Sequence, residues 1–194
     1  MAKPFIKWVG GKSQLIPEIT QRLPEYVKNG KPYIYVEPFS GSAAVALHLL
    51  DSGHPPSAII LNDINTDLVN LYKVVKSNPH ELLAYLKTLQ VEYDELEDKE
   101  AKQPYYYTKR EEFNTRKADD IKHAGLFIFL NRAGFNGLYR VNSKNKFNVP
   151  IGSYKKPNFV FEDTILHASK ALANVEIYNQ SYEDTLSYLE QFNK

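Results

Sequence analysis

The segment from Tyr33 to Asp63 constrains the fold more than any other part of the chain. The β-rich run YIYVEPF (33–39) leads through a Ser-Gly-Ser turn into the helical run AAVALHLL (43–50), and SAIILND (57–63) follows as a second strand. Strand, turn, helix and strand in this order begin a parallel α/β sheet with crossover helices.

A mainly helical insertion is predicted after the second strand and its helix. Asn78 and Pro79 begin a new helix, with Asn as the cap and Pro in the first turn. The pattern stays helical and loop-like to about residue 159 and includes the strongly apolar helix IKHAGLFIFLNR (121–132). We assign residues 76–162 to this inserted subdomain.

The chain then returns to the sheet. A short helix around residues 164–173 precedes VEIYN (175–179), a third strand, and EDTLSYLEQF (183–192) is an amphipathic helix. Three strands with crossover helices make half of a doubly wound sheet. We therefore expect a Rossmann-like domain, formed by residues 1–75 and 163–194, that is incomplete at its C-terminus.

Composition excludes several classes of protein. The chain has no cysteine, which rules out disulfides and thiolate metal sites, and its five histidines show no close metal-ligand spacing. It has neither the apolar run of a signal peptide nor one that could span a bilayer. We expect a cytoplasmic protein without a metal.

The distribution of charge is more informative than the net charge of +1. Residues 101–160 carry twelve Lys or Arg against four Asp or Glu, and residues 131–160 carry six basic residues and no acidic one. Such a patch favours an anionic partner that meets one surface of the molecule. The alternative is a solvated basic face.

Two glycine motifs indicate ligand binding. In EPFSGS (37–42), a glycine after a strand allows close approach of a ligand to backbone N–H groups, and Asp63 at the end of the next strand could accept hydrogen bonds from a ribose. The alternative is a structural turn with a helix-capping Asp. The second motif, KWVGGK (7–12), could cradle a carboxylate or phosphate. Its alternative is a turn with solvated lysines.

The stretch NRAGFNGLYRVNSKNKFNVPIG (131–152) combines arginine, lysine, asparagine and aromatic residues without an acid. Arg and Lys contact phosphates and guanine edges, Asn can read adenine edges, and aromatic rings stack on bases. These residues favour nucleic acid over the alternative of an Asn- and Gly-rich surface loop with buried aromatics.

These segments, in this order, resemble the Dam-type DNA adenine-N6 methyltransferases, which include GATC-specific methylases of bacteria and phages. The blocks FIKWVGGKSQL, YVEPFSGSAAV, ILNDIN, FLNRAGFNGLYRVNSKNKFNVPIGSYKKP and NQSYEDTL carry the resemblance, which covers essentially all 194 residues. It implies a transferase that moves a methyl group from S-adenosylmethionine to adenine in double-stranded DNA.

The resemblance also implies residue roles in cofactor binding. One motif holds the methionine part, the glycine turn follows it, an acid binds the ribose with an apolar neighbour against the adenine, and a last segment completes the adenine pocket. In that order these residues are Trp8, Gly10, Gly11 and Lys12; Glu37, Pro38, Phe39 and Gly41; Asp63 and Ile64; Ser181 and Tyr182.

For DNA, the resemblance implies that Arg140 reads one guanine and Lys7 the other, while Phe135 enters the base stack beside Asn136. An inserted aromatic suits an enzyme that must flip its target base. Further DNA contacts are expected from Arg132, Asn142, Pro150 and Tyr154.

One family motif is absent from this sequence. The family holds the target amino group with an Asp-Pro-Pro-Tyr motif after its fourth strand, and no such sequence occurs in the 194 residues. We therefore expect a chain that ends before its catalytic motif and is inactive alone, from a bacterial or phage enzyme that is monomeric at full length. The alternatives are a non-catalytic DNA-binding remnant and one half of a split methylase.

Overall fold

The three strand-like runs pair into one parallel sheet. The computed structural model describes residues 2–184, 187 and 190. The strands are β1 (Ile34–Glu37), β2 (Ala58–Asn62) and β3 (Glu176–Tyr178), in the order β1-β2-β3. Val36 pairs with Ile60, and Leu61 with Ile177, so all three strands end at the same edge of the sheet. The α/β prediction is confirmed.

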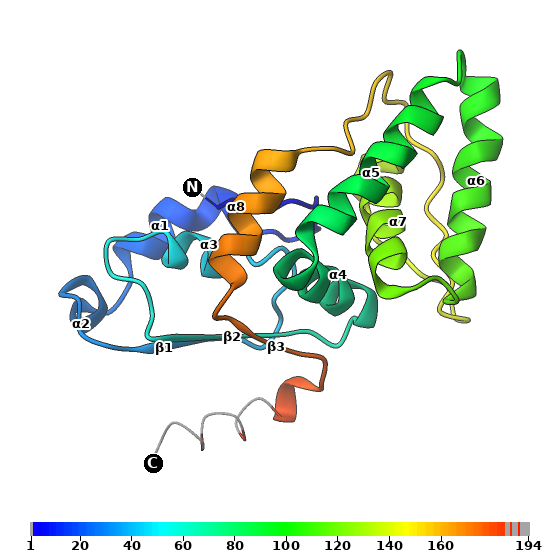
Figure 1. The fold of residues 1–194 in the computed structure, drawn as a ribbon. Helices are drawn as coiled ribbons and strands as arrows, with labels where there is room; N and C mark the ends of the chain where they lie inside the picture. Colours follow the sequence, from blue (N-terminus) through cyan, green and yellow to red (C-terminus); the bar gives the residue numbers. More distant parts are fainter. Residues whose placement is uncertain (1, 185–186, 188–189, 191–194) are drawn as a thin grey trace.

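Helices cover one face of this sheet. Ile59 and Leu61 point from β2 into the main hydrophobic core, together with apolar residues of the neighbouring helices. Figure 1 shows α1, α3, α4 and α8 on that side of the sheet. The helices of this half are α1 (Ile16–Gln21), α2 (Glu25–Lys28), α3 (Ala44–Leu50), α4 (Thr66–Ser77) and α8 (Glu162–Leu172), with 3₁₀ turns η1 (Ser13–Leu15) and η3 (Tyr182–Asp184).

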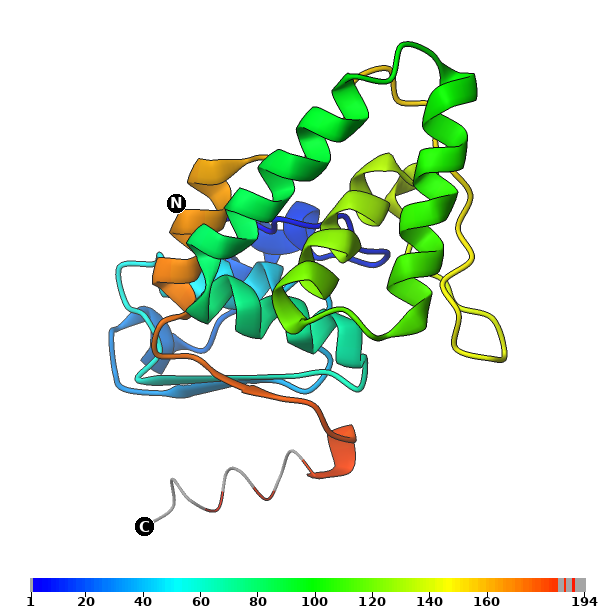
Figure 2. The same cartoon turned by 45° about the vertical axis from the view of Figure 1, so that its right-hand side comes forward.

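The segment between α4 and α8, where the insertion is predicted, is built around one buried helix. It contains α5 (Pro79–Asp94), α6 (Lys99–Thr115), α7 (Asp120–Ala133) and the 3₁₀ turn η2 (Phe135–Gly137). Every residue from 123 to 131 of α7 is buried, because α4, α5 and α6 all pack against this helix (Figure 2). This surrounding explains why its sequence is apolar on all sides.

One core runs from the sheet through α4 into α5, α6 and α7. The division into residues 1–75 with 163–194 and residues 76–162 therefore stays a prediction. No helix within the described residues is long and apolar enough to cross a membrane.

Local details differ from the sequence-based expectation. Asn78 is the N-cap residue of α5 and Pro79 lies in its first turn, as predicted, but the Asn78 side chain makes no capping hydrogen bond. Its carbonyl accepts from Leu82 N at 3.0 Å. The short elements η1, α1 and α2 lie in residues 13–28, for which no element is predicted from the sequence. Most of the helix expected at residues 183–192 lies outside the described residues.

Candidate functional site

A cavity of about 270 Å³ opens where β1 and β2 end. Eight of the twelve residues predicted to bind the cofactor line it. These eight are Trp8, Gly10, Gly11, Lys12, Glu37, Phe39, Gly41 and Asp63, and the lining is completed by Val9, Ser40, Ser42, Ala44 and Val45, which the sequence analysis did not single out.

The turn between β1 and α3 needs its glycine. Gly41 has a positive φ of +49°, and a Cβ atom there would lie 3.0 Å from Cδ1 of Trp8. The missing side chain thus lets the indole ring lie directly against the turn. Ala43, at φ 50° and ψ 30°, also adopts the left-handed conformation, at a cost of about 1 kcal/mol for a non-glycine residue.

Asp63 connects the glycine turn to the start of α4. Its Oδ2 accepts a hydrogen bond from Gly41 N at 3.1 Å, and its Oδ1 accepts one from Asn65 N at 3.0 Å. The cap of α4 is Asn65, whose side chain accepts from Leu68 N at 3.1 Å. Asp63 therefore does not cap the helix, and its carboxylate lies at the cavity instead.

Asn62 does not line the cavity but supports the strand ends beside it, and it was not among the residues predicted from the sequence. It is 1% exposed, and its Nδ2 donates to the carbonyls of Pro38 at 3.2 Å and Gln180 at 3.0 Å. Its Oδ1 accepts from Gln180 N at 3.1 Å. One amide thus holds the ends of all three strands together, and the available signal was a polar residue closing an apolar strand.

The KWVGGK segment forms a turn that lines the cavity. Gly11 N donates to Trp8 O at 3.0 Å, Gly10 has φ +76°, and Lys12 Nζ donates to Gly10 O at 2.6 Å. A Cβ on Gly11 would lie 3.1 Å from Ser42 Oγ. The two glycine motifs are therefore in contact.

Glu37 is the electrostatically unusual group of the cavity. Its Oε1 accepts hydrogen bonds from Tyr35 Oη at 2.9 Å and Ala46 N at 3.3 Å, while its buried Oε2 has no partner among the residues that the structure describes. Burial raises the pKa of this carboxyl to about 7, although the two hydrogen bonds and Lys12 lower it. A buried carboxylate oxygen without a partner can accept a hydrogen bond from a ligand.

The other four predicted cofactor residues lie outside the cavity lining. Ile64 is 75% exposed, and the Tyr182 ring packs against the Phe39 ring at 5.3 Å between centroids. Pro38 uses its carbonyl for Asn62, and Ser181 O accepts from Asp184 N at 3.1 Å. Phe39, Ile64 and Tyr182 together leave exposed apolar surface near the cavity.

The basic loop, residues 134–157, follows α7 and is stiffened by its own hydrogen bonds. Antiparallel bridges join Gly134 to Ile151 and Val141 to Phe147. The Asn142 Oδ1 accepts from the backbone N–H groups of Lys144 at 2.9 Å and Lys146 at 3.0 Å. Figure 2 shows the loop, in yellow, running beside α6.

Several predicted DNA contacts lie exposed on or beside this loop. Arg140 donates from Nε to Asn148 Oδ1 at 2.7 Å, which orients its guanidinium. Lys7 donates from Nζ to Tyr154 Oη at 3.0 Å. The Phe135 side chain is 49% exposed. The next residue, Asn136, has a positive φ of 53°.

Arg132 is placed differently from those side chains, because it is partly buried at the end of α7. Arg132 donates from Nη2 to Phe5 O at 3.2 Å and lies 4.1 Å above the Phe161 ring, and burial lowers the pKa of its guanidinium. This placement favours a role in holding the N-terminal segment. Pro150 lies exposed on the loop, and its carbonyl accepts a hydrogen bond from Phe135 N at 2.9 Å.

Comparisons with known proteins identify the family of the chain. The family model of the D12 class N6 adenine-specific DNA methyltransferases matches residues 8–193. The type II methyltransferase M.MjaIII of Methanocaldococcus jannaschii is 42% identical over 190 residues, which are 97% of this chain and 65% of that protein. The DNA adenine methylase of Escherichia coli K12 is 38% identical over 185 residues, 95% of this chain and 60% of that protein.

The chain belongs to the D12 class of N6 adenine-specific DNA methyltransferases. This membership confirms the Dam-type resemblance. The chain spans less than two thirds of the length of these two relatives.

Proposed function

We propose that this chain supplies the methyl-donor site and the DNA-reading surface of an adenine-N6 DNA methyltransferase that acts on duplex DNA at GATC-like sites. The observation that carries the proposal is the cavity itself, because residues predicted separately from three distant motifs line one space. The basic loop, with its excess of positive charge, lies beside the Trp8 segment that lines the same cavity.

The residues of the cavity fit S-adenosylmethionine. The unpartnered Oε2 of Glu37 could accept from the ammonium of the methionine part, and Lys12 could pair with its carboxylate. Gly41 allows the Trp8 ring to lie against the turn at the cavity wall, and Asp63 has the position of a ribose-binding acid. When bound, this cofactor supplies an activated methyl group.

The basic loop fits DNA by charge and by geometry. A guanidinium held by Asn148 is prepared for bidentate contact with a guanine edge, which would contribute about 1–3 kcal/mol to base discrimination. The half-exposed Phe135 ring could enter the stack that an extruded adenine leaves.

Calorimetric titration of the chain with S-adenosylhomocysteine tests the cofactor site, and titration with a GATC duplex and a scrambled duplex tests the DNA surface. Transfer of a labelled methyl group is measured in parallel, because the 194 residues contain no Asp-Pro-Pro-Tyr sequence. We expect S-adenosylhomocysteine to bind, Glu37→Gln to weaken it, and the exposed-site control Glu81→Gln to leave it unchanged.

Each outcome has a defined meaning. Binding of both ligands supports the proposal, whether or not transfer is detected. Binding of DNA without S-adenosylhomocysteine would favour a non-catalytic DNA-binding remnant. A folded chain that binds neither ligand would refute the proposed function.

A further inference from the structure

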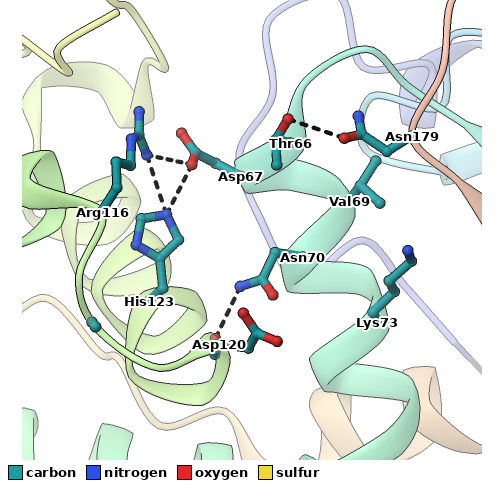
Figure 3. A pocket seen from close by; sticks show the side chains of 10 residues that line it. Thr66, Asp67, Val69, Asn70, Lys73, Arg116, Asp120, His123 and Asn179 are labelled. Atoms are coloured by element: carbon teal, nitrogen blue, oxygen red, sulfur yellow. Dashed lines mark hydrogen bonds and ion pairs between the residues drawn. The ribbon is translucent and has the colours of Figure 1, made fainter.

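Asp67 is a buried charge with three side-chain partners. It is 6% exposed in the first turn of α4 and is the only Asp, Glu, Lys or Arg among the buried residues of the described chain. Its Oδ1 accepts from His123 Nε2 at 2.8 Å and from Arg116 Nη1, and its Oδ2 accepts from Tyr139 Oη at 2.6 Å. Figure 3 shows Asp67 facing Arg116 and His123.

These partners come from three separate segments. His123 belongs to α7, Arg116 ends α6 in the left-handed conformation at φ 56°, and Tyr139 belongs to the basic loop. Burial alone would raise the pKa of Asp67, but hydrogen bonds from His123, Tyr139 and Arg116, with the charge of Arg116, lower it below its usual value. The carboxylate is therefore held in its charged form.

Tyr139 also touches the wall of the cofactor cavity. Its ring lies 5.5 Å from the Trp8 ring and 5.4 Å from the Phe127 ring, between centroids. Trp8 in turn lies against Gly41 and lines the cavity. One residue of the loop thus contacts the cofactor side through its ring and α4 through its hydroxyl.

Asp67 reaches the loop at a second point. Arg116, which bonds to Asp67, also donates from Nη2 to the carbonyl of Asn145 at 3.2 Å. Asn145 lies in the tight turn between Val141 and Phe147. Both ends of the segment 139–145 are therefore anchored to α4, with Arg140 immediately after the first anchor.

We propose that Asp67 and Tyr139 form a positioning pair that fixes the basic loop against the cofactor cavity. The pair orients the Arg140 side chain toward DNA. It also couples cofactor binding to the preference of the chain for one DNA sequence. This inference rests on the proposed methyltransferase function. Neither residue touches the DNA itself: each acts through the backbone that carries Arg140.

Tyr139→Phe tests the pair, because it removes the hydroxyl and keeps the ring against Trp8. We expect the preference for a GATC duplex over a scrambled duplex, measured by anisotropy with S-adenosylhomocysteine present, to fall about tenfold, the smaller end of one arginine–guanine contact. Affinity for the scrambled duplex should stay within about twofold.

Tyr105→Phe is the matched control, since Tyr105 Oη donates to the Glu92 carboxylate at 2.7 Å between α5 and α6. It removes a hydrogen bond of the same type and similar length, away from the loop. The preference should be unchanged in this variant even if both variants lose thermal stability, which separates positioning from general stabilisation.

Amide hydrogen exchange on the unsubstituted chain gives a second readout if Tyr139→Phe unfolds at the assay temperature. The inference expects S-adenosylhomocysteine to slow exchange at residues 140–148, and unchanged exchange there would overturn it. If folded Tyr139→Phe keeps the full preference for the GATC duplex, this inference is overturned and the proposed function is not. An unsubstituted chain with no preference and no S-adenosylhomocysteine binding would overturn the proposed function, and the inference with it.

Discussion

Asn131 holds the backbone of Lys7 by both atoms of its side-chain amide. Oδ1 accepts from Lys7 N at 2.9 Å, and Nδ2 donates to Lys7 O at 2.8 Å and to Gly137 O at 2.8 Å. The residue is 3% exposed at the end of α7. It therefore joins the segment that carries Lys7 and Trp8 to η2, the 3₁₀ turn that contains Phe135 and Asn136.

Asn131→Asp should break this connection at almost constant volume. The carboxylate oxygen that replaces Nδ2 would face two carbonyls that lose their donor, so we expect the free energy of unfolding to fall by about 3 kcal/mol. Urea denaturation measures this, with the exposed Asn29→Asp as the control. A loss below about 0.5 kcal/mol, the range of ordinary surface changes, would contradict the role of Asn131.

Glu37 predicts an unusual dependence of stability on pH. Its folded pKa of about 7 lies above the usual value of 4.5, so the folded ligand-free chain binds this proton more tightly than the unfolded chain does. The resulting stabilisation is present below about pH 4.5 and is lost as the pH rises through about 7. The shift corresponds to about 3 kcal/mol.

Glu37→Gln isolates this contribution, because glutamine keeps the shape and does not titrate. Urea denaturation at pH 4.5 and pH 8 should show the variant gaining about 3 kcal/mol on the unsubstituted chain between the two pH values. The gain should shrink with saturating S-adenosylhomocysteine, whose ammonium would stabilise the charged carboxylate. Parallel pH profiles without ligand would show that the pKa is not raised.

Gly41→Ala should damage the cavity and leave the sheet in place. The alanine must adopt the positive φ of this position, and its Cβ would lie 3.0 Å from the Trp8 ring. We therefore expect the free energy of unfolding to fall by about 2 kcal/mol. The affinity for S-adenosylhomocysteine should fall at least tenfold, because the displaced Trp8 indole lines the cavity. A tenfold loss corresponds to about 1.4 kcal/mol of binding free energy.

Gly53→Ala is the control for that change, since a Cβ at Gly53 meets no atom of the described residues within 4 Å. Thermal denaturation and calorimetric titration of both variants check the prediction. Equal ligand affinity in Gly41→Ala and the unsubstituted chain would remove Gly41 from the binding site.

Local patterns were sufficient to predict the three-stranded parallel sheet and to single out two residues that line the cavity. A strand followed by Ser-Gly-Ser and a helix identified Gly41, and the acid closing the next strand identified Asp63. Both signals depend only on residues that are close to each other along the chain. The backbone conformation at Gly41 and the meeting of strand ends then bring them together.

The residues that join the segments could not be found in that way. Asp67 looks like an ordinary acid in the first turn of a helix, yet its partners Arg116, His123 and Tyr139 lie 49, 56 and 72 positions away. Asn131 lies at the end of an apolar helix, and its acceptor on Lys7 is 124 positions distant. Such roles appear only when tertiary packing places carbonyls and donors around the side chain.

Arg140→Ala distinguishes base reading from phosphate contact. Because Asn148 orients this guanidinium, its removal should lower the preference for a GATC duplex about 10- to 100-fold and lower affinity for a scrambled duplex much less. Lys144→Ala, on the same loop, should weaken binding of both duplexes equally. It should also reduce the slope of log affinity against log salt concentration by about 1. Anisotropy titrations over a range of salt concentrations measure both effects. Equal losses on the two duplexes in Arg140→Ala would make Arg140 a phosphate contact, and binding that does not depend on salt would contradict the role of the basic loop altogether.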